Sequence, residues 1–265
     1  MNSYASTGES FSISDPNEVW IMEMMSKGPG HRGSVWVARR VPAGYVCGHA
    51  NQARIQTWPR DDASNGTLWA PDVVEFAVAQ GLYPATAPSA AFSFSDVFDP
   101  VTPAGARLCE LRVWNFFRQV IASGEEFAAQ YLDYVQGRNL SNRMPLWVEA
   151  GRPVAVNDTM WYMRAHYTGT WFDQRTDVGA GAFHAELRKR PVVWQQPAEA
   201  VGEQSPGDGT SNSTAASTYV NERNVGYQGT FFHFVAQARA WMPYPVGGII
   251  WFGVDDTSHS VRTPM

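Results

Sequence analysis

DPNEVWIMEMMSKGPGHRGSVWVARRVPAGYVCGHANQARI, residues 15–55, is the stretch that decides the fold class of this chain. The apolar runs at 18–25 and 34–41 are bounded by Pro and Gly residues, which is typical of strands between tight turns. A third run, 45–55, follows after a further Pro-Ala-Gly turn. We therefore predict three strands in an antiparallel meander.

Helical signals follow this meander. Apolar side chains recur about every three residues over 106–123, which predicts a helix with one buried face. Residues 71–81 begin with Pro-Asp and end with Gly, as expected for a shorter helix. A third helix is predicted at 158–167, with Asn157 or Asp158 as N-cap and Gly169 as C-cap.

The C-terminal third contains a loop and two more strands. Residues 195–218 are mostly Gln, Gly, Ser, Thr, Ala and Pro, which predicts a mobile loop. The aromatic and β-branched residues of 231–241 and 247–254 predict strands, the second of them buried. The order of strands, helices, loop and strands favours one α+β domain over 1–265 rather than a doubly wound repeat.

Composition excludes several classes of protein. The chain has 265 residues, of which 44% are hydrophobic and 17% charged, so disorder of the whole chain is excluded. The net charge of −5 comes without long runs of either sign, which argues against nucleic-acid and anionic-membrane partners. No apolar run reaches the roughly 18 residues of a membrane span, and no signal peptide is visible at the start. The cellular compartment stays open.

The sequence favours neither a metal nor an organic cofactor. Its six His residues include no HExxH motif and no pair at i, i+4, and its two cysteines, Cys47 and Cys109, form no CxxC pair. Gly-rich phosphate loops and the Gly-x-Ser-x-Gly elbow of serine hydrolases are also missing. Both cysteines fall in apolar patterns, where we expect small buried side chains.

Asn51 is chemically unusual for its place in the predicted meander. A polar amide inside a strand pattern needs a hydrogen-bond partner or a ligand. It is either a satisfied amide at a strand end or a donor to an oxyanion, and its local sequence leaves both interpretations open.

Six blocks together resemble a known family. They are residues 15–55 quoted above, RAHYTGTWFD (164–173), VGAGAF (178–183), RPVVW (190–194), YVNERN (219–224) and GGIIWFGVDD (247–256). In this order they resemble the bacterial-type dipeptidases of peptidase family C69. The related secernins are less similar in the HANQARI and WFGVDD segments.

The resemblance implies an N-terminal-nucleophile hydrolase with a four-layer αββα sandwich. In such enzymes the thiol of a mature N-terminal Cys attacks the peptide carbonyl, and its own α-amino group accepts the proton. Aligned on the HANQARI block, Asn51 would stabilise the oxyanion. Arg223 would match an arginine near the nucleophile, although an ordinary surface arginine fits the sequence equally well.

One departure from the family concerns the nucleophile. In the family it lies well upstream of the DPNEVW block, whereas removal of Met1 here would expose Asn2. We therefore expect a partial hydrolase domain, incomplete at its N-terminus and inactive alone. Its unpaired sheet edge and open apolar face predict poor solubility or self-association, so a homo-oligomer stays open.

The expected substrates are dipeptides, selected by their charged termini. Asp255 or Asp256 would hold the ammonium group, and Arg54 or Arg164 the carboxylate. The main alternative is a non-catalytic interaction or scaffold protein derived from the same sandwich. A carbohydrate-binding module is less well supported, because the Trp residues lie inside apolar runs.

Overall fold

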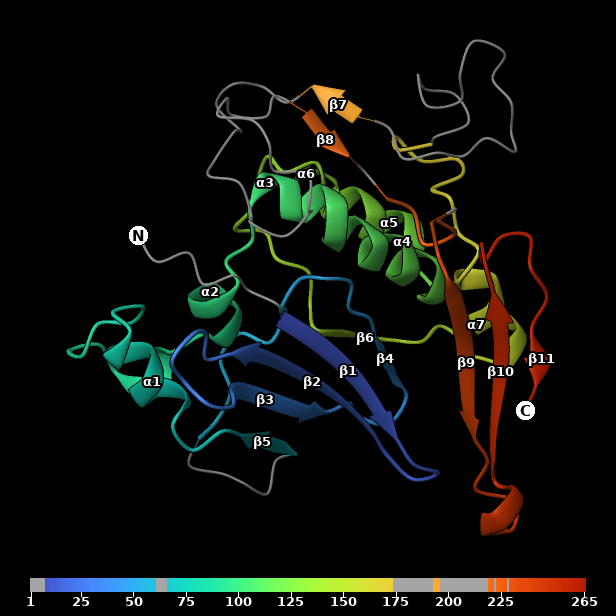
Figure 1. Cartoon of the computed structure of the whole chain (residues 1–265). Coiled ribbons are helices and arrows are strands. Elements are labelled where there is room, and N and C mark those ends of the chain that lie inside the picture. The colour runs from blue at the N-terminus through green and yellow to red at the C-terminus, as the bar shows by residue number, and fades with distance from the viewer. Residues whose placement is uncertain (1–7, 61–65, 174–192, 196–218, 222, 228) are drawn as a thin grey trace.

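The computed structural model describes residues 8–60, 66–173, 193–195, 219–221, 223–227 and 229–265. Most of its strands lie before or after the helical part of the chain, which is consistent with the α+β class expected from the sequence (Figure 1). The loop predicted at 195–218 lies outside the described residues, except for its first residue. The VGAGAF block lies outside them as well.

The main sheet has four antiparallel strands in the order β1-β2-β3-β5. They are β1 (Gly8–Ser14), β2 (Val19–Ser26), β3 (Ser34–Arg40) and β5 (Thr67–Trp69). The strands predicted at 18–25 and 34–41 are confirmed as β2 and β3. Strand β1 was not expected, because only two of its seven residues, Phe11 and Ile13, are large and apolar.

The long third strand predicted at 45–55 is wrong. Only β4 (Tyr45–Cys47) forms, and it pairs with β6 (Trp147–Glu149) rather than with β3. Beyond Cys47 the backbone leaves the strand, and the amides of Arg54 and Ile55 donate to the buried carboxylate of Glu23 at 2.6 and 2.9 Å. The Glu23 side chain therefore accepts the backbone hydrogen bonds that a neighbouring strand would accept if 54–55 continued the strand.

Most helices follow this region. They are α1 (Val73–Ala79), α2 (Phe94–Phe98), α3 (Pro103–Gly105), the π-helical turn η3 (Ala106–Glu110), α4 (Leu111–Val120), α5 (Gly124–Gln130), α6 (Leu132–Val135) and α7 (Val156–Tyr162). Short 3-10 turns occur at Ser89–Ala91 and Tyr244–Val246. The helix predicted at 71–81 is confirmed as α1, and that at 106–123 as η3 followed by α4.

Helix α7 begins earlier and ends sooner than the sequence suggests. Its N-cap is Ala155, whose backbone N–H donates to the Asp158 carboxylate at 2.8 Å, so Asp158 lies within the first turn. The C-cap is Met163 rather than Gly169. The predicted N-terminus is wrong because Asp158 acts from the third helical position rather than from the N-cap. From there its carboxylate accepts the backbone N–H of the N-cap residue.

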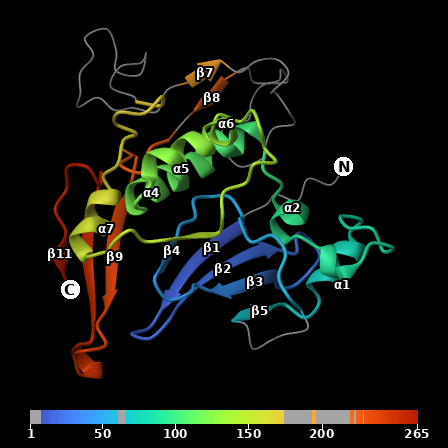
Figure 2. The ribbon, with the colours of Figure 1, turned by 180° about the vertical axis from the view of Figure 1, so that it is seen from behind.

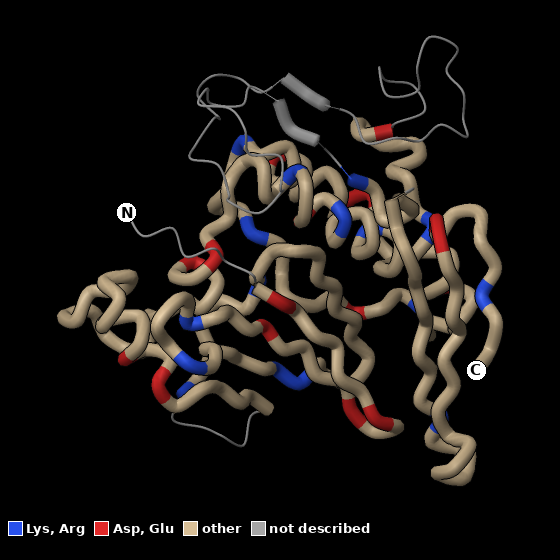
Figure 3. The backbone as a smooth tube through the Cα atoms, viewed as in Figure 1, with Lys and Arg blue, Asp and Glu red and all other residues tan. Residues whose placement is uncertain are grey.

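A second antiparallel sheet has the order β11-β10-β9, with β9 (Phe232–Ala238), β10 (Gly248–Val254) and β11 (Thr263–Pro264). The expectation that 247–254 is buried is wrong, since Val254 is 60% exposed and Ile250 is 43% exposed. Figure 3 shows charged residues only near the ends of the β9–β10 hairpin. A short ladder of β7 (Val193–Gln195) and β8 (Tyr219–Asn221) completes the described strands.

Two hydrophobic cores hold these elements together. One packs the inner face of the main sheet against residues 53–58, α1 and the segment before α2, around Ile21, Val37 and Phe92. The other is formed by α4, α5 and α6 around Trp114 and Phe117. Helices α4–α6 lie above the main sheet, and the β9–β10 hairpin with α7 stands at the side away from α1 (Figures 1 and 2).

Candidate functional site

Three of the sequence blocks meet beyond the end of strand β10. The guanidinium of Arg164 donates from Nε to the carbonyl of Thr257 at 3.1 Å and from Nη2 to that of Ser260 at 3.2 Å. The Tyr167 hydroxyl donates to the backbone carbonyl of Arg223. Segments 164–167, 223–226 and 255–260 are thus joined directly, although up to 96 residues separate them in sequence.

A tight contact fixes the centre of this junction. His166 Nε2 and Ser258 Oγ are 2.8 Å apart, and Ser258 Oγ also lies 3.3 Å from the carbonyl of Gly226. A Cβ atom at Gly226 would lie 2.6 Å from Ser258 Oγ and 2.8 Å from His166 Nε2, so a larger residue would displace one of these side chains. The backbone therefore packs directly against the His166–Ser258 pair.

The two adjacent carboxylates in this junction differ in their roles. Asp255 is exposed, has a positive φ of 66° and donates its backbone N–H to the Phe231 carbonyl. Asp256 instead accepts from the Ser258 N–H at 2.8 Å and contacts His259 Nδ1 at 2.9 Å. Burial tends to raise the pKa of Asp256, but these hydrogen bonds outweigh burial and lower its pKa below the ordinary value. Asp255 is therefore the freer of the two carboxylates.

Arg223 is held at the same junction. Its guanidinium lies 5.6 Å from the centroid of the Tyr227 ring, and its Nε is buried without a hydrogen-bond partner among the described residues. Its backbone carbonyl accepts from Tyr167. The Tyr227 ring therefore helps to fix this side chain.

Asn51 lies in a bend after β4 rather than in a strand. Its φ is 56°, a left-handed conformation that asparagine tolerates better than most residues. Arg112 Nη2 donates to Asn51 Oδ1 at 2.9 Å. Because a guanidinium can only donate, this contact fixes the amide so that Nδ2, with its two N–H groups, points away from Arg112. The exposed amide is therefore oriented as a donor.

Arg54, expected to hold a substrate carboxylate, is instead a buried structural residue. Its Nε contacts Glu110 at 3.0 Å, and its other nitrogens donate to the carbonyls of Gly48, Pro145 and Leu146 at 3.0, 2.9 and 3.2 Å. The residue is only 4% exposed. Its guanidinium is thus occupied by protein acceptors.

Neither cysteine has the properties of a nucleophile. Cys47 lies at the end of β4, and Cys109 is buried in the π-helical turn. Burial is the main cause that raises the pKa of each thiol to about 11. The thiolate, which is the attacking species, is therefore scarce at neutral pH.

Comparison with protein families identifies the chain. The model of peptidase family C69 matches residues 2–265. The chain belongs to peptidase family C69. The C69 resemblance of the six sequence blocks is thereby confirmed.

Curated relatives of this C69 chain are named as dipeptidases. It is 26% identical over 167 residues to a probable dipeptidase of Latilactobacillus sakei, 28% identical over 176 residues to one of Salmonella dublin, and 26% identical over 179 residues to a dipeptidase of Bifidobacterium longum. These matches cover 63%, 63% and 66% of this chain but only 31%, 34% and 32% of the relatives. The C69 chain thus spans about a third of the length of the relatives it matches.

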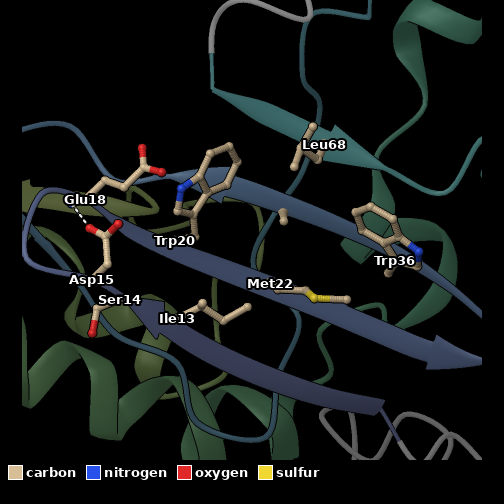
Figure 4. A pocket seen from close by; sticks show the side chains of 9 residues that line it. Ile13, Ser14, Asp15, Glu18, Trp20, Met22, Trp36 and Leu68 are labelled. Carbon is tan, nitrogen blue, oxygen red and sulfur yellow. Dashed lines mark hydrogen bonds between the residues drawn. The ribbon is translucent and has the colours of Figure 1, made fainter. Parts of the chain in front are cut away.

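The outward face of the main sheet in this C69 chain is apolar and hollowed (Figure 4). The hollow has a volume of about 490 Å³ and is lined mainly by Ile13, Trp20, Met22, Trp36 and Leu68. Two carboxylates stand at one end. Asp15 accepts the backbone N–H groups of Asn17 and Glu18, which lowers its pKa, and Glu18 contacts Arg40 at 3.4 Å. Asp15 thus stabilises the turn between β1 and β2, Glu18 pairs with β3, and the residues that line the hollow between the strands are mainly apolar.

In the described part of the C69 chain, no group of three or more His, Cys, Asp and Glu side chains is arranged to hold a metal ion. The same part contains no helix long and apolar enough to cross a membrane. His166, Ser258 and Arg112 were not among the residues predicted from the sequence. His166 lies inside the RAHYTGTWFD block, which could have indicated it, whereas a single sequence carries no signal for Ser258 and Arg112.

Proposed function

We propose that this chain carries part of the active site of a cysteine-type dipeptidase. The family membership supports peptide hydrolysis, and the names of the relatives support dipeptides as substrates. The structural observation that carries the proposal is the exposed Asn51 amide, whose N–H groups point away from Arg112 because its Oδ1 accepts from that guanidinium. Such a donor stabilises the negative oxygen that develops when a peptide carbonyl is attacked.

The nucleophile in this proposal is a Cys at a mature N-terminus, contributed by polypeptide outside these 265 residues. Its thiol would form a bond to the carbonyl carbon while its α-amino group accepts the thiol proton. The leaving amine then takes a proton, and water releases the acid half of the dipeptide. Cys47 and Cys109 cannot fill this role because both are internal and have no free α-amino group.

The junction beyond β10 would bind the charged ends of the substrate. Of the two acids, exposed Asp255 is better placed to pair with an ammonium group than Asp256, whose carboxylate already accepts from Ser258 and His259. Arg164 is the better carboxylate partner of the two arginines, because among the described residues it donates to two carbonyls only, whereas Arg54 donates to three, pairs with Glu110 and is 4% exposed. Pairing both termini at a fixed separation would favour short peptides.

We also infer the four-layer αββα arrangement for the complete fold. The main sheet has helices on one side and an apolar face on the other, which is how an inner layer of a sandwich is built. A second sheet against the hollow of Figure 4 would complete the stack.

Hydrolysis assays test the proposed activity. Amino-acid release from a dipeptide panel is measured for the 265-residue chain and for the same chain extended by the in-frame sequence encoded upstream of Met1. We expect activity only in an extended form that matures to an N-terminal Cys, with the Bifidobacterium longum dipeptidase as positive control. Release by the unextended chain at comparable rates would refute the assignment of the nucleophile.

A non-catalytic interaction protein is the second candidate. The observation in its favour is the large apolar surface on the outward sheet face and on the β9–β10 hairpin, where Phe232 and Phe234 are exposed. Stop codons directly upstream of a genuine start at Met1 would support this function and leave the chain without a nucleophile. An upstream in-frame segment with a Cys after a short leader would support the dipeptidase.

A further inference from the structure

Arg262 carries a buried positive charge that no partner among the described residues neutralises. It follows the loop after β10, two residues beyond Ser260, and within the described part of the chain all three of its guanidinium nitrogens are buried without a hydrogen bond. Buried guanidinium groups are normally paired with a carboxylate or with several carbonyls, as Arg54 is in the same molecule. Arg262 is therefore an exception that requires a physical reason.

Two other basic side chains surround the same loop. Arg164 Nη2 donates to the carbonyl of Ser260, and His233 Nε2 lies 2.7 Å from Ser260 Oγ. Burial, followed by repulsion from Arg164, lowers the pKa of Arg262. Burial, then Arg262 and Arg164, lowers the pKa of His233 as well. The guanidinium groups of Arg164 and Arg262 therefore repel each other at this loop.

The Asp256 carboxylate does not neutralise these guanidinium groups. Asp256 raises the pKa of His233 only as the smallest influence, and its oxygens accept from Ser258 and contact His259. Two further polar atoms of the junction, Thr257 Oγ1 and His233 Nδ1, are also buried with no hydrogen-bond partner in the described part of the chain. Thr257 and His233 are 1% and 3% exposed, so water does not satisfy these atoms by surface contact.

We propose that Arg262, together with Arg164, forms a binding site for the carboxylate of a small peptide or amino acid. The planar guanidinium presents parallel N–H groups that match the two oxygens of a carboxylate. A bound carboxylate would relieve the Arg164–Arg262 repulsion and supply the missing acceptors. The proposal deepens the dipeptidase function and rests on it for the choice of ligand.

The first test measures the thermal stability of the chain without ligand. Because the Arg262 charge is buried and unpaired, Arg262→Gln should leave the melting temperature of the ligand-free chain unchanged or raise it. Arg138→Gln, on an exposed residue outside this loop, makes the same charge change as a control. A fall of more than about 4 °C for Arg262→Gln alone would show that Arg262 is an ordinary structural residue and overturn the proposal.

Binding gives the second test, measured by calorimetry and thermal shift on the intact 265-residue chain. Alanylalanine, its C-terminal amide, free alanine and acetate are titrated in turn. We expect alanylalanine at tenfold its Kd to raise the melting temperature by about 3 °C, and the amide to have no effect. Binding should weaken at least about tenfold in Arg262→Gln and remain unchanged in Arg138→Gln.

The ligand arms separate the sources of the carboxylate. If free alanine and alanylalanine bind equally well, the site accepts the carboxylate of an amino acid as well as that of a peptide. If acetate alone binds, or if the amide binds as well as alanylalanine, the assignment is wrong. The test is independent of catalysis, since this chain need not hydrolyse the ligand. If binding depends on Arg262 but no extended form hydrolyses dipeptides, the dipeptidase proposal is wrong and the carboxylate site stands. If an extended form hydrolyses the dipeptide and its amide equally well, the carboxylate site is wrong and the dipeptidase proposal stands.

Discussion

Arg112 Nη2 donates to Asn51 Oδ1 at 2.9 Å and links the polar side of helix α4 to the bend after β4. The same nitrogen lies 3.3 Å from the Ala50 carbonyl, so the guanidinium holds the backbone of the bend as well as the amide. The orientation of the amide is therefore set by a residue 61 positions away in sequence.

This contact leads to a prediction for Asn51. Since its φ is 56°, Asn51→Gly should change the free energy of unfolding little, while Asn51→Ala should cost about 1 kcal/mol. Both variants should lower kcat of a hydrolytically active, extended form by about 10² to 10³-fold, because both remove the oxyanion donor. Urea denaturation of the 265-residue chain and kcat of the extended form are the two measurements. A stable Asn51→Gly variant with full kcat would contradict the role of the amide.

The cysteines should be unreactive in the folded chain. With a pKa of about 11 for each thiol, fewer than about one in a thousand is ionised at pH 7.5. Alkylation of Cys47 and Cys109 by iodoacetamide, followed by mass spectrometry, should be slower than in urea-unfolded chain by a factor of about 100. Rapid alkylation of either thiol under native conditions would reopen the search for an internal nucleophile.

The sequence predicted those elements whose pattern is local. Strands β2 and β3 and helices α1 and α4 show clear periodicity between turn residues, and all four form as expected. The prediction failed at 45–55 because the competing interaction is not local. A carboxylate in β2, Glu23, captures the backbone N–H groups of Arg54 and Ile55, and no feature of 45–55 alone reveals that partner.

The candidate site likewise contains residues that the sequence identified correctly and one that it did not. The sequence blocks identified Arg164, Arg223, Asp255 and Asp256, which the structure brings to one junction. Arg54 has the same residue type and an equally distinctive block, yet its guanidinium is enclosed by Glu110 and three carbonyls. Whether an arginine is free to bind a ligand depends on tertiary contacts, which sequence patterns do not contain.

Glu23 should make stability depend on pH. Burial is the main cause that raises its pKa to about 7 from 4.5, against hydrogen bonds from the amides of Ile55 and Arg54. Because the folded state holds the proton more tightly, this contribution is complete below about pH 4.5 and is lost as the pH rises through 7. The loss is on the order of 3 kcal/mol. Glu23→Gln should remove it.

Urea denaturation between pH 5 and 8 measures this effect. The difference in free energy of unfolding between the wild type and Glu23→Gln should move in favour of the variant as the pH rises. Glu75→Gln, on the exposed side of α1, should run parallel to the wild type. A constant difference between wild type and Glu23→Gln across this range would show that Glu23 titrates normally.

The outward face of the main sheet should cause self-association. Ile13 and Leu68 are both 52% exposed on this face, beside the hollow lined by Trp20 and Trp36. Leu68→Lys should shift the chain toward the monomer in size-exclusion chromatography with light scattering, because desolvating an ammonium group against this surface opposes association. Leu82→Lys, which changes an exposed leucine outside the sheet, should leave the distribution unchanged. If both variants associate like the wild type, the β9–β10 hairpin, rather than the main sheet, is the surface that copies of this chain use.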